Sequence, residues 1–135
     1  MDRLLLPRPL CEALLEEARC SLPNECCGLL GGRGEQATRI FPATNALASP
    51  TAYDIAVPEL IALFRRLRAE KLELVGIYHS HPTGDNVPSA RDRERAFYPE
   101  TAYVIVSLRA NAALPIRAFR ICDGELAELP VEVTA

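Results

Sequence analysis

The sequence has no apolar run that approaches the roughly 20 consecutive residues of a membrane-spanning helix. Its opening segment, residues 1–7, contains too short an apolar stretch for a signal peptide, so no targeting signal is expected. The formal net charge is only −3, which gives no electrostatic case for nucleic acid or an anionic membrane as a partner. These absences favour a cytoplasmic protein that binds neither nucleic acid nor membrane.

A disulfide framework is also missing. The five cysteines are an odd number without regular spacing, and Cys26 and Cys27 are adjacent. This usage is typical of reduced thiols in the cytosol. Because adjacent residues of a strand point to opposite faces, these two cysteines cannot easily bind one metal ion. We interpret both as small buried strand residues.

No internal repeat or low-complexity linker divides the chain, and its length predicts a single domain over residues 1–135. Apolar periodicity predicts helices over Pro9–Ser21, Pro58–Lys71 and Ser89–Phe97. Strands are predicted over Asn24–Gly31, Thr38–Thr44, Leu72–His79 and Ala102–Leu108, followed by a hairpin of Arg117–Cys122 and Glu125–Val133. The fold class is therefore α/β, with a curved mixed sheet and about three helices packed on it.

The chain has only two histidines, His79 and His81, and both stand at the end of an apolar strand. Residues i and i+2 of a strand share one face, about 6.6 Å apart, so the two imidazoles can converge on one ion. Asp92 lies in the first turn of the helix expected from Ser89, and the intervening loop lets that turn fold back over the strand end. Two imidazoles and a carboxylate are a common ligand set for a catalytic zinc, which keeps its fourth position for water. The pattern predicts a hydrolase.

Some of these residues also have a purely structural interpretation. Ser89 and Asp92 have the spacing of a capping box, in which Ser89 caps the helix and Asp92 reaches back to it. That interaction would occupy the Asp92 carboxylate. Glu25 stands at the entry of an apolar strand, where a carboxylate costs several kcal/mol unless it is solvated or paired. It is either an exposed strand-end residue or the partner of a metal-bound water.

Together, Glu25, His79-x-His81, Ser89 and Asp92 resemble the JAMM motif of the JAB1/MPN/Mov34 metalloprotease family, with every motif position filled. The chain also resembles the small prokaryotic members outside the motif, in Glu25–Gly31, Asn45, Ser49-Pro50, Tyr53 and Pro58-Glu59. The resemblance implies the MPN/JAB fold, which has a cytidine-deaminase-like architecture. The family's inactive members lack metal ligands, whereas this sequence keeps them.

The resemblance also implies a role for each motif residue. His79, His81 and Asp92 would hold Zn²⁺, which lowers the pKa of its water toward about 7 and polarises the scissile carbonyl. Glu25 would be the general base that takes the proton of the water and passes it to the leaving amine. Ser89 would donate a hydrogen bond to the oxyanion, which assigns its hydroxyl to the substrate rather than to the capping box.

The substrate expected from the resemblance is a conjugate of a small carrier protein. Family members cleave isopeptide or peptide bonds after the C-terminal glycines of ubiquitin-like proteins, and the small prokaryotic ones resemble enzymes that act on sulfur carriers. The expected partner is thus a ubiquitin-like or sulfur-carrier protein that ends in Gly-Gly. Other classes stay open: a non-catalytic MPN-like binding module, a small-molecule amide hydrolase or deaminase, and a descendant of related phage tail assembly proteins. The oligomeric state stays undetermined.

Overall fold

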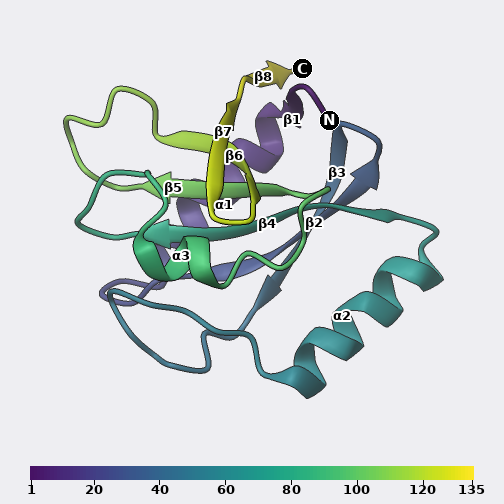
Figure 1. Ribbon diagram of the computed structural model, residues 1–135, viewed down its shortest axis with the longest axis horizontal. Helices are drawn as coiled ribbons and strands as arrows, with labels where there is room; N and C mark the ends of the chain where they lie inside the picture. Colours follow the sequence, from purple (N-terminus) through teal and green to yellow (C-terminus); the bar gives the residue numbers. More distant parts are fainter.

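The computed structural model describes residues 1–135 and contains one eight-stranded mixed sheet with three helices (Figure 1). The helices are α1 (Arg8–Cys20), α2 (Val57–Ala69) and α3 (Ala90–Glu94). The strands are β1 (Leu4–Pro7), β2 (Cys27–Arg33), β3 (Gln36–Ala43), β4 (Glu73–His81), β5 (Ala102–Ser107), β6 (Ile116–Cys122), β7 (Glu125–Leu129) and β8 (Val131–Thr134). Their spatial order is β7-β6-β5-β4-β2-β3-β1-β8. Since Pro130 alone separates the two outermost strands, the sheet must curve toward a barrel, as predicted.

Both faces of the sheet are covered by apolar side chains. Helix α1 contributes Leu14 and Ala18 to the core on one face, and α2 contributes Leu63 and Leu67 to the core on the other. In Figure 1, α1 lies behind the central strands and α2 stands at the lower right. The central strands β4 and β5 are buried between the two cores along most of their length. None of the helices is long and apolar enough to cross a membrane.

The two ends of the chain differ from the prediction. Strand β1 was not predicted, because its four residues show no periodicity of their own, and it is held by parallel pairing with β3 and β8. The single strand predicted over Glu125–Val133 is wrong. It breaks at Pro130, which has no N–H for the ladder. The Pro130 carbonyl accepts from Leu4 N at 2.9 Å, and the chain crosses over to pair with β1.

Three boundaries near the predicted site also differ. Strand β2 begins at Cys27 rather than Asn24, because the Glu25 N–H donates to the carbonyl of Ser49 in a loop instead of to a strand. Strand β4 runs to His81 rather than His79, because β5 pairs with it along its whole end. Helix α3 stops at Glu94 rather than Phe97. Both histidines therefore lie inside a paired strand.

Gly28 in β2 makes room for an aromatic ring of the neighbouring strand. Its cross-strand partner is Tyr78 of β4, which is fully buried and whose hydroxyl donates to Glu17 of α1 at 2.6 Å. A Cβ at position 28 would lie 2.5 Å from the carbonyl oxygen of Phe41 and 2.5 Å from Cζ of Tyr78. The backbone oxygen cannot move aside, so only glycine fits beside this ring.

We expect Gly28→Ala to destabilise the protein by about 1–3 kcal/mol, the usual cost of overpacking a well-filled core. The measurement is the free energy of unfolding in denaturant. Gly84→Ala is the matched control, because its added Cβ would meet no atom closer than 4.0 Å. Equal stability of the two variants would contradict the packing argument.

Candidate metal centre

The end of β4 presents two imidazoles on one face of the sheet. His79 is 1% exposed and His81 is partly buried, and their Nε2 atoms are 3.1 Å apart. The intervening Ser80 points the other way, where its hydroxyl accepts from the Cys26 N–H at 2.8 Å. The alternation of the strand thus brings the two nitrogens together, as the His-x-His spacing predicts.

Helix α3 supplies the carboxylate. Asp92 stands in its first turn, and Oδ2 lies 3.1 Å from Nε2 of His79 and 3.1 Å from Nε2 of His81. The same oxygen accepts from the Ser89 N–H at 2.9 Å, while the Ser89 hydroxyl accepts from the Asp92 N–H at 3.1 Å. The capping box is therefore formed. It does not compete with the cluster, because it holds the oxygen in place against both imidazoles.

The spacing of these three atoms suits a small tetrahedral ion. With ligand bonds of about 2.0 Å, neighbouring ligands of a tetrahedral zinc lie about 3.3 Å apart. The three atoms here form a triangle with every side at 3.1 Å. Among the His, Cys, Asp and Glu side chains, these three residues form the group able to hold a metal ion.

The hydrogen bond made by Nδ1 of His81, on the side of the ring away from Asp92, also supports a metal site. Its Nδ1 lies 2.6 Å from the backbone carbonyl oxygen of Asp85, which can only accept, so Nδ1 carries a hydrogen. In the neutral ring, Nε2 then turns a lone pair toward the Asp92 carboxylate. A metal ion bound between this lone pair and the carboxylate would satisfy both groups. A backbone carbonyl is also a usual outer partner of a metal-bound histidine.

Burial and hydrogen bonding set the charges of the cluster. Burial lowers the pKa of His79, which keeps this imidazole neutral, as a metal ligand must be. For Asp92, burial raises the pKa, but hydrogen bonds from the two histidines outweigh it and hold the pKa well below its usual range. For His81, burial lowers the pKa, but hydrogen bonds to Asp92 and the Asp85 carbonyl prevail and raise it. The carboxylate is therefore ionised beside a neutral, buried ring.

Glu25 is buried next to this cluster but lies outside the ligand group. It is 4% exposed, so the interpretation as an exposed strand-end residue is wrong. Cys27 of β2 pairs with His79, and Glu25, two residues before Cys27, is close enough to His81 for the charge of that ring to act on it. Its Oε1 has no hydrogen-bond partner. Burial raises the pKa of Glu25 to about 7, with the charge of His81 opposing.

The adjacent cysteines take no part in the cluster. Cys26 belongs to the core on one face of the sheet and Cys27 to the core on the other, and both thiols are buried and free. Burial raises the pKa of Cys26 to about 11 and that of Cys27 to about 12. The prediction of small buried residues on opposite faces is confirmed.

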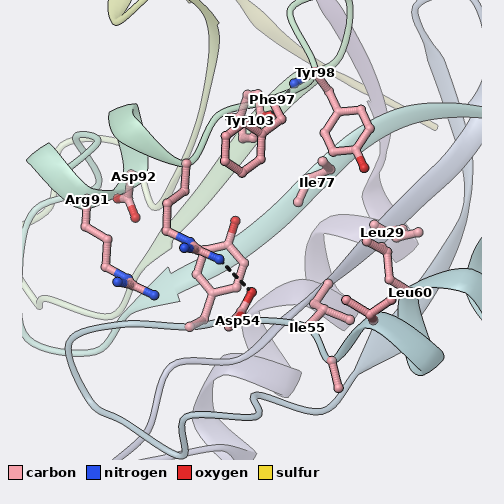
Figure 2. A pocket seen from close by; sticks show the side chains of 14 residues that line it. Leu29, Asp54, Ile55, Leu60, Ile77, Arg91, Asp92, Phe97, Tyr98 and Tyr103 are labelled. Atoms are coloured by element: carbon pink, nitrogen blue, oxygen red, sulfur yellow. Dashed lines mark hydrogen bonds and ion pairs between the residues drawn. The ribbon is translucent and has the colours of Figure 1, made fainter.

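A mostly apolar cavity of about 300 Å³ opens beside Asp92. It lies between the segment before α2, the end of α3 and the sheet, and its lining comprises Leu29, Tyr53–Val57, Leu60, Ile77, Arg91, Asp92, Arg95, Phe97, Tyr98 and Tyr103. Figure 2 shows Arg91 and Asp92 together at one end, with Ile55 and Leu60 at the other. Arg95 closes part of the rim through an ion pair with Asp54 at 3.1 Å. The cavity therefore adjoins the cluster of His79, His81 and Asp92.

Two contributions to the site were not predicted from the sequence. The ring of Tyr53 stacks on His79, with centroids 4.5 Å apart and 24° between planes. The Asn45 side chain organises the loop before α2: its Nδ2 donates to the carbonyls of Glu25 and Ala52, and its Oδ1 accepts from the Asp54 N–H. Both residues stand in an irregular loop, where spacing carries no signal. Their only trace in the sequence was the family resemblance.

Comparison with known proteins shows which family the chain matches. A family model described as prokaryotic homologs of the JAB domain matches residues 7–122. A CysO-cysteine peptidase of Mycobacterium bovis is 36% identical over 132 residues, with 96% of this chain and 90% of the relative covered. A desampylase of Haloferax volcanii is 37% identical over 113 residues, covering 78% and 81%. A probable TtuB-protein conjugate cleaving protease of Thermus thermophilus is 37% identical over 133 residues, covering 95% and 82%.

Solved structures show the same architecture. The solution structure of a Desulfitobacterium hafniense protein superposes with a TM-score of 0.86 at 32% identity, covering 97% of this chain and 92% of that one. A JAB1/MPN domain protein from Archaeoglobus fulgidus superposes with a TM-score of 0.63 at 20% identity, covering 96% and 98%. The latter likeness concerns the fold alone, and it confirms the predicted MPN/JAB class.

Proposed function

Because the chain belongs to the family of prokaryotic JAB-domain proteins, we propose that it is a zinc-dependent peptidase that cleaves conjugates of a small carrier protein. The relatives named above are peptidases of such conjugates. The observation that carries the proposal is the triangle of two imidazole nitrogens and one carboxylate oxygen, with every side at 3.1 Å and a buried, unpartnered glutamate beside it.

His79, His81 and Asp92 are proposed to hold the zinc through the three atoms of this triangle. A bound zinc ion would act as a Lewis acid that polarises the scissile carbonyl, and it would lower the pKa of its bound water toward about 7. Glu25 takes the proton of the attacking water and delivers it to the leaving nitrogen. Its unpartnered Oε1 is free to do so, and it lies outside the ligand group.

Ser89 is proposed to stabilise the oxyanion that develops on the scissile carbonyl. Its oxygen accepts from the Asp92 N–H in the capping box, which uses a lone pair and leaves the hydroxyl hydrogen free to donate. The structural and the catalytic roles of Ser89 are therefore compatible. The backbone hydrogen bond also restricts the position of the hydroxyl, which favours a preorganised donor.

The proposed substrate partner is a ubiquitin-like or sulfur-carrier protein that ends in Gly-Gly. The backbone groups of Tyr53 and Ile55 make no hydrogen bonds within the protein, and both residues line the cavity. An extended carrier tail can pair with them as an added strand, with its apolar side chains in the cavity. Glycine residues, which have no side chain, then fit the narrow path that leads from the cavity to the metal site. We further propose a cytoplasmic location, since all five thiols are free.

We predict one Zn²⁺ per chain in the wild-type protein and in Glu25→Gln, and none in His81→Ala. Glu25→Gln should keep the metal but lose about 10²–10⁴-fold in rate, as expected for a missing general base. Metal analysis of the purified proteins and turnover of a carrier conjugate measure both quantities. Loss of zinc from Glu25→Gln would make Glu25 a ligand instead of the base.

Ser89→Ala should lower kcat by about 10²–10³-fold with little change in KM, because an oxyanion donor acts mainly in the transition state. It should also cost about 1 kcal/mol of stability through the lost cap. Ser89→Thr keeps both functions and serves as the matched control. A Ser89→Ala protein that melts earlier but turns over normally would leave Ser89 with the capping role alone.

The carrier preference is tested with two fusions of one ubiquitin-like carrier, which differ in having Gly-Gly or Ala-Ala before the scissile bond. We expect kcat/KM to fall for the Ala-Ala fusion, because its methyl groups must pass the groove beside Asp92. Equal kcat/KM would overturn the proposed selection for glycine while leaving the metal chemistry intact. Cleavage of neither fusion, with zinc bound, would point to a non-catalytic binding module.

A further inference from the structure

The two histidines of the triangle are held in different ways. His81 is oriented by a hydrogen bond between its Nδ1 and the Asp85 carbonyl. His79 has no such bond, because its Nδ1 is buried without any hydrogen-bond partner. A metal-bound imidazole usually has an outer partner that fixes the plane of its ring. For His79, that restraint must come from packing.

The packing partner is the ring of Tyr53. It lies 4.5 Å from the His79 ring, nearly parallel to it, and also forms part of the cavity wall. We propose that Tyr53 is a positioning residue, whose ring fixes the plane of His79 by stacking and so directs its Nε2 at the metal. The inference rests on the metal centre of the proposed function. Offset-stacked rings gain about 0.5–1.5 kcal/mol beyond the area they bury, and the contact restricts rotation of the imidazole.

The Tyr53 backbone is held independently of its ring. The flanking residues Ala52 and Asp54 are both bound by the Asn45 side chain, at 3.0 and 3.3 Å. Ala46 N also donates to the Asp54 carbonyl at 2.8 Å. A substitution at position 53 therefore removes the ring without removing the hydrogen bonds that shape the loop. The tyrosine hydroxyl takes no part in the stacking, so phenylalanine should replace tyrosine here.

The experiment measures the affinity of the full-length protein for Zn²⁺ in competition with a chelator. We expect Tyr53→Leu to bind zinc about 10–100-fold more weakly, the usual cost of losing an outer partner of a ligand. Tyr53→Phe should bind like the wild type. Tyr98→Leu is the matched control, because Tyr98 lines the same cavity but packs on Phe64 instead of a histidine.

A second measurement separates positioning from general loosening of the loop. The proton signals of the His79 ring should lie upfield in the wild type and in Tyr53→Phe, through the ring current of the stacked partner, and should move downfield in Tyr53→Leu. His81 signals should stay in place. If Tyr53→Leu fails to fold, Tyr53→Met provides the same comparison with a flexible apolar side chain.

Two outcomes overturn the inference: zinc affinity unchanged in Tyr53→Leu, or an equal loss in Tyr98→Leu. Both are distinct from failure of the proposed function, in which the wild type binds no zinc or binds it as tightly as His81→Ala. Weaker zinc binding in Tyr53→Leu, with Tyr53→Phe and Tyr98→Leu at the wild-type affinity, supports the positioning role.

Discussion

A single oxygen atom, Oδ2 of Asp92, is the point on which the site depends. It accepts from the Ser89 N–H and faces the Nε2 atoms of both histidines. The capping box sets where this oxygen stands relative to α3, and the histidines set where it stands relative to β4. The five-residue helix α3 is thus held against the end of β4 in part by the oxygen that faces both histidines. The capping box and the proposed metal-ligand cluster share this oxygen, so a change in one alters the other.

The sheet fixes the positions of the two histidines that face Asp92. Strand β4 lies between β2 and β5 and is buried between the two apolar cores, so the histidines at its end have little freedom. Pairing of β4 with β5 continues as far as His81, opposite Ser107. Pairing with β2 brings the segment that precedes Cys27, and with it Glu25, to the same end of β4. The two histidines thus lie at the end of a central, buried strand. The cavity beside them is lined mainly by residues of loops and helix ends.

Hydrogen bonding explains why the buried carboxyl groups of Glu25 and Asp92 differ in pKa. Asp92 is surrounded by hydrogen-bond donors and stays ionised, whereas Glu25 has an unpartnered oxygen and a pKa raised to about 7. The two carboxylates are thereby suited to the different tasks proposed for them, Asp92 as a metal ligand and Glu25 as a general base. This division follows from the surroundings of each group and not from the residue type, which differs by only one methylene.

The sequence by itself determined the α/β class, most of the helices and strands, and the convergence of His79, His81 and Asp92, because these follow from local periodicity and from the alternation of a strand. It left the capping box and the metal cluster as competing interpretations, whereas the tertiary structure shows one oxygen, Oδ2 of Asp92, in contact with both the Ser89 N–H and the two histidines. Burial of Glu25, stacking of Tyr53 on His79, and the pairing of β8 with β1 were decided by tertiary structure alone. These three features depend on contacts between segments that are far apart in the chain or lie in irregular loops. Such contacts are stabilised by packing between elements, which leaves no repeating pattern in the sequence.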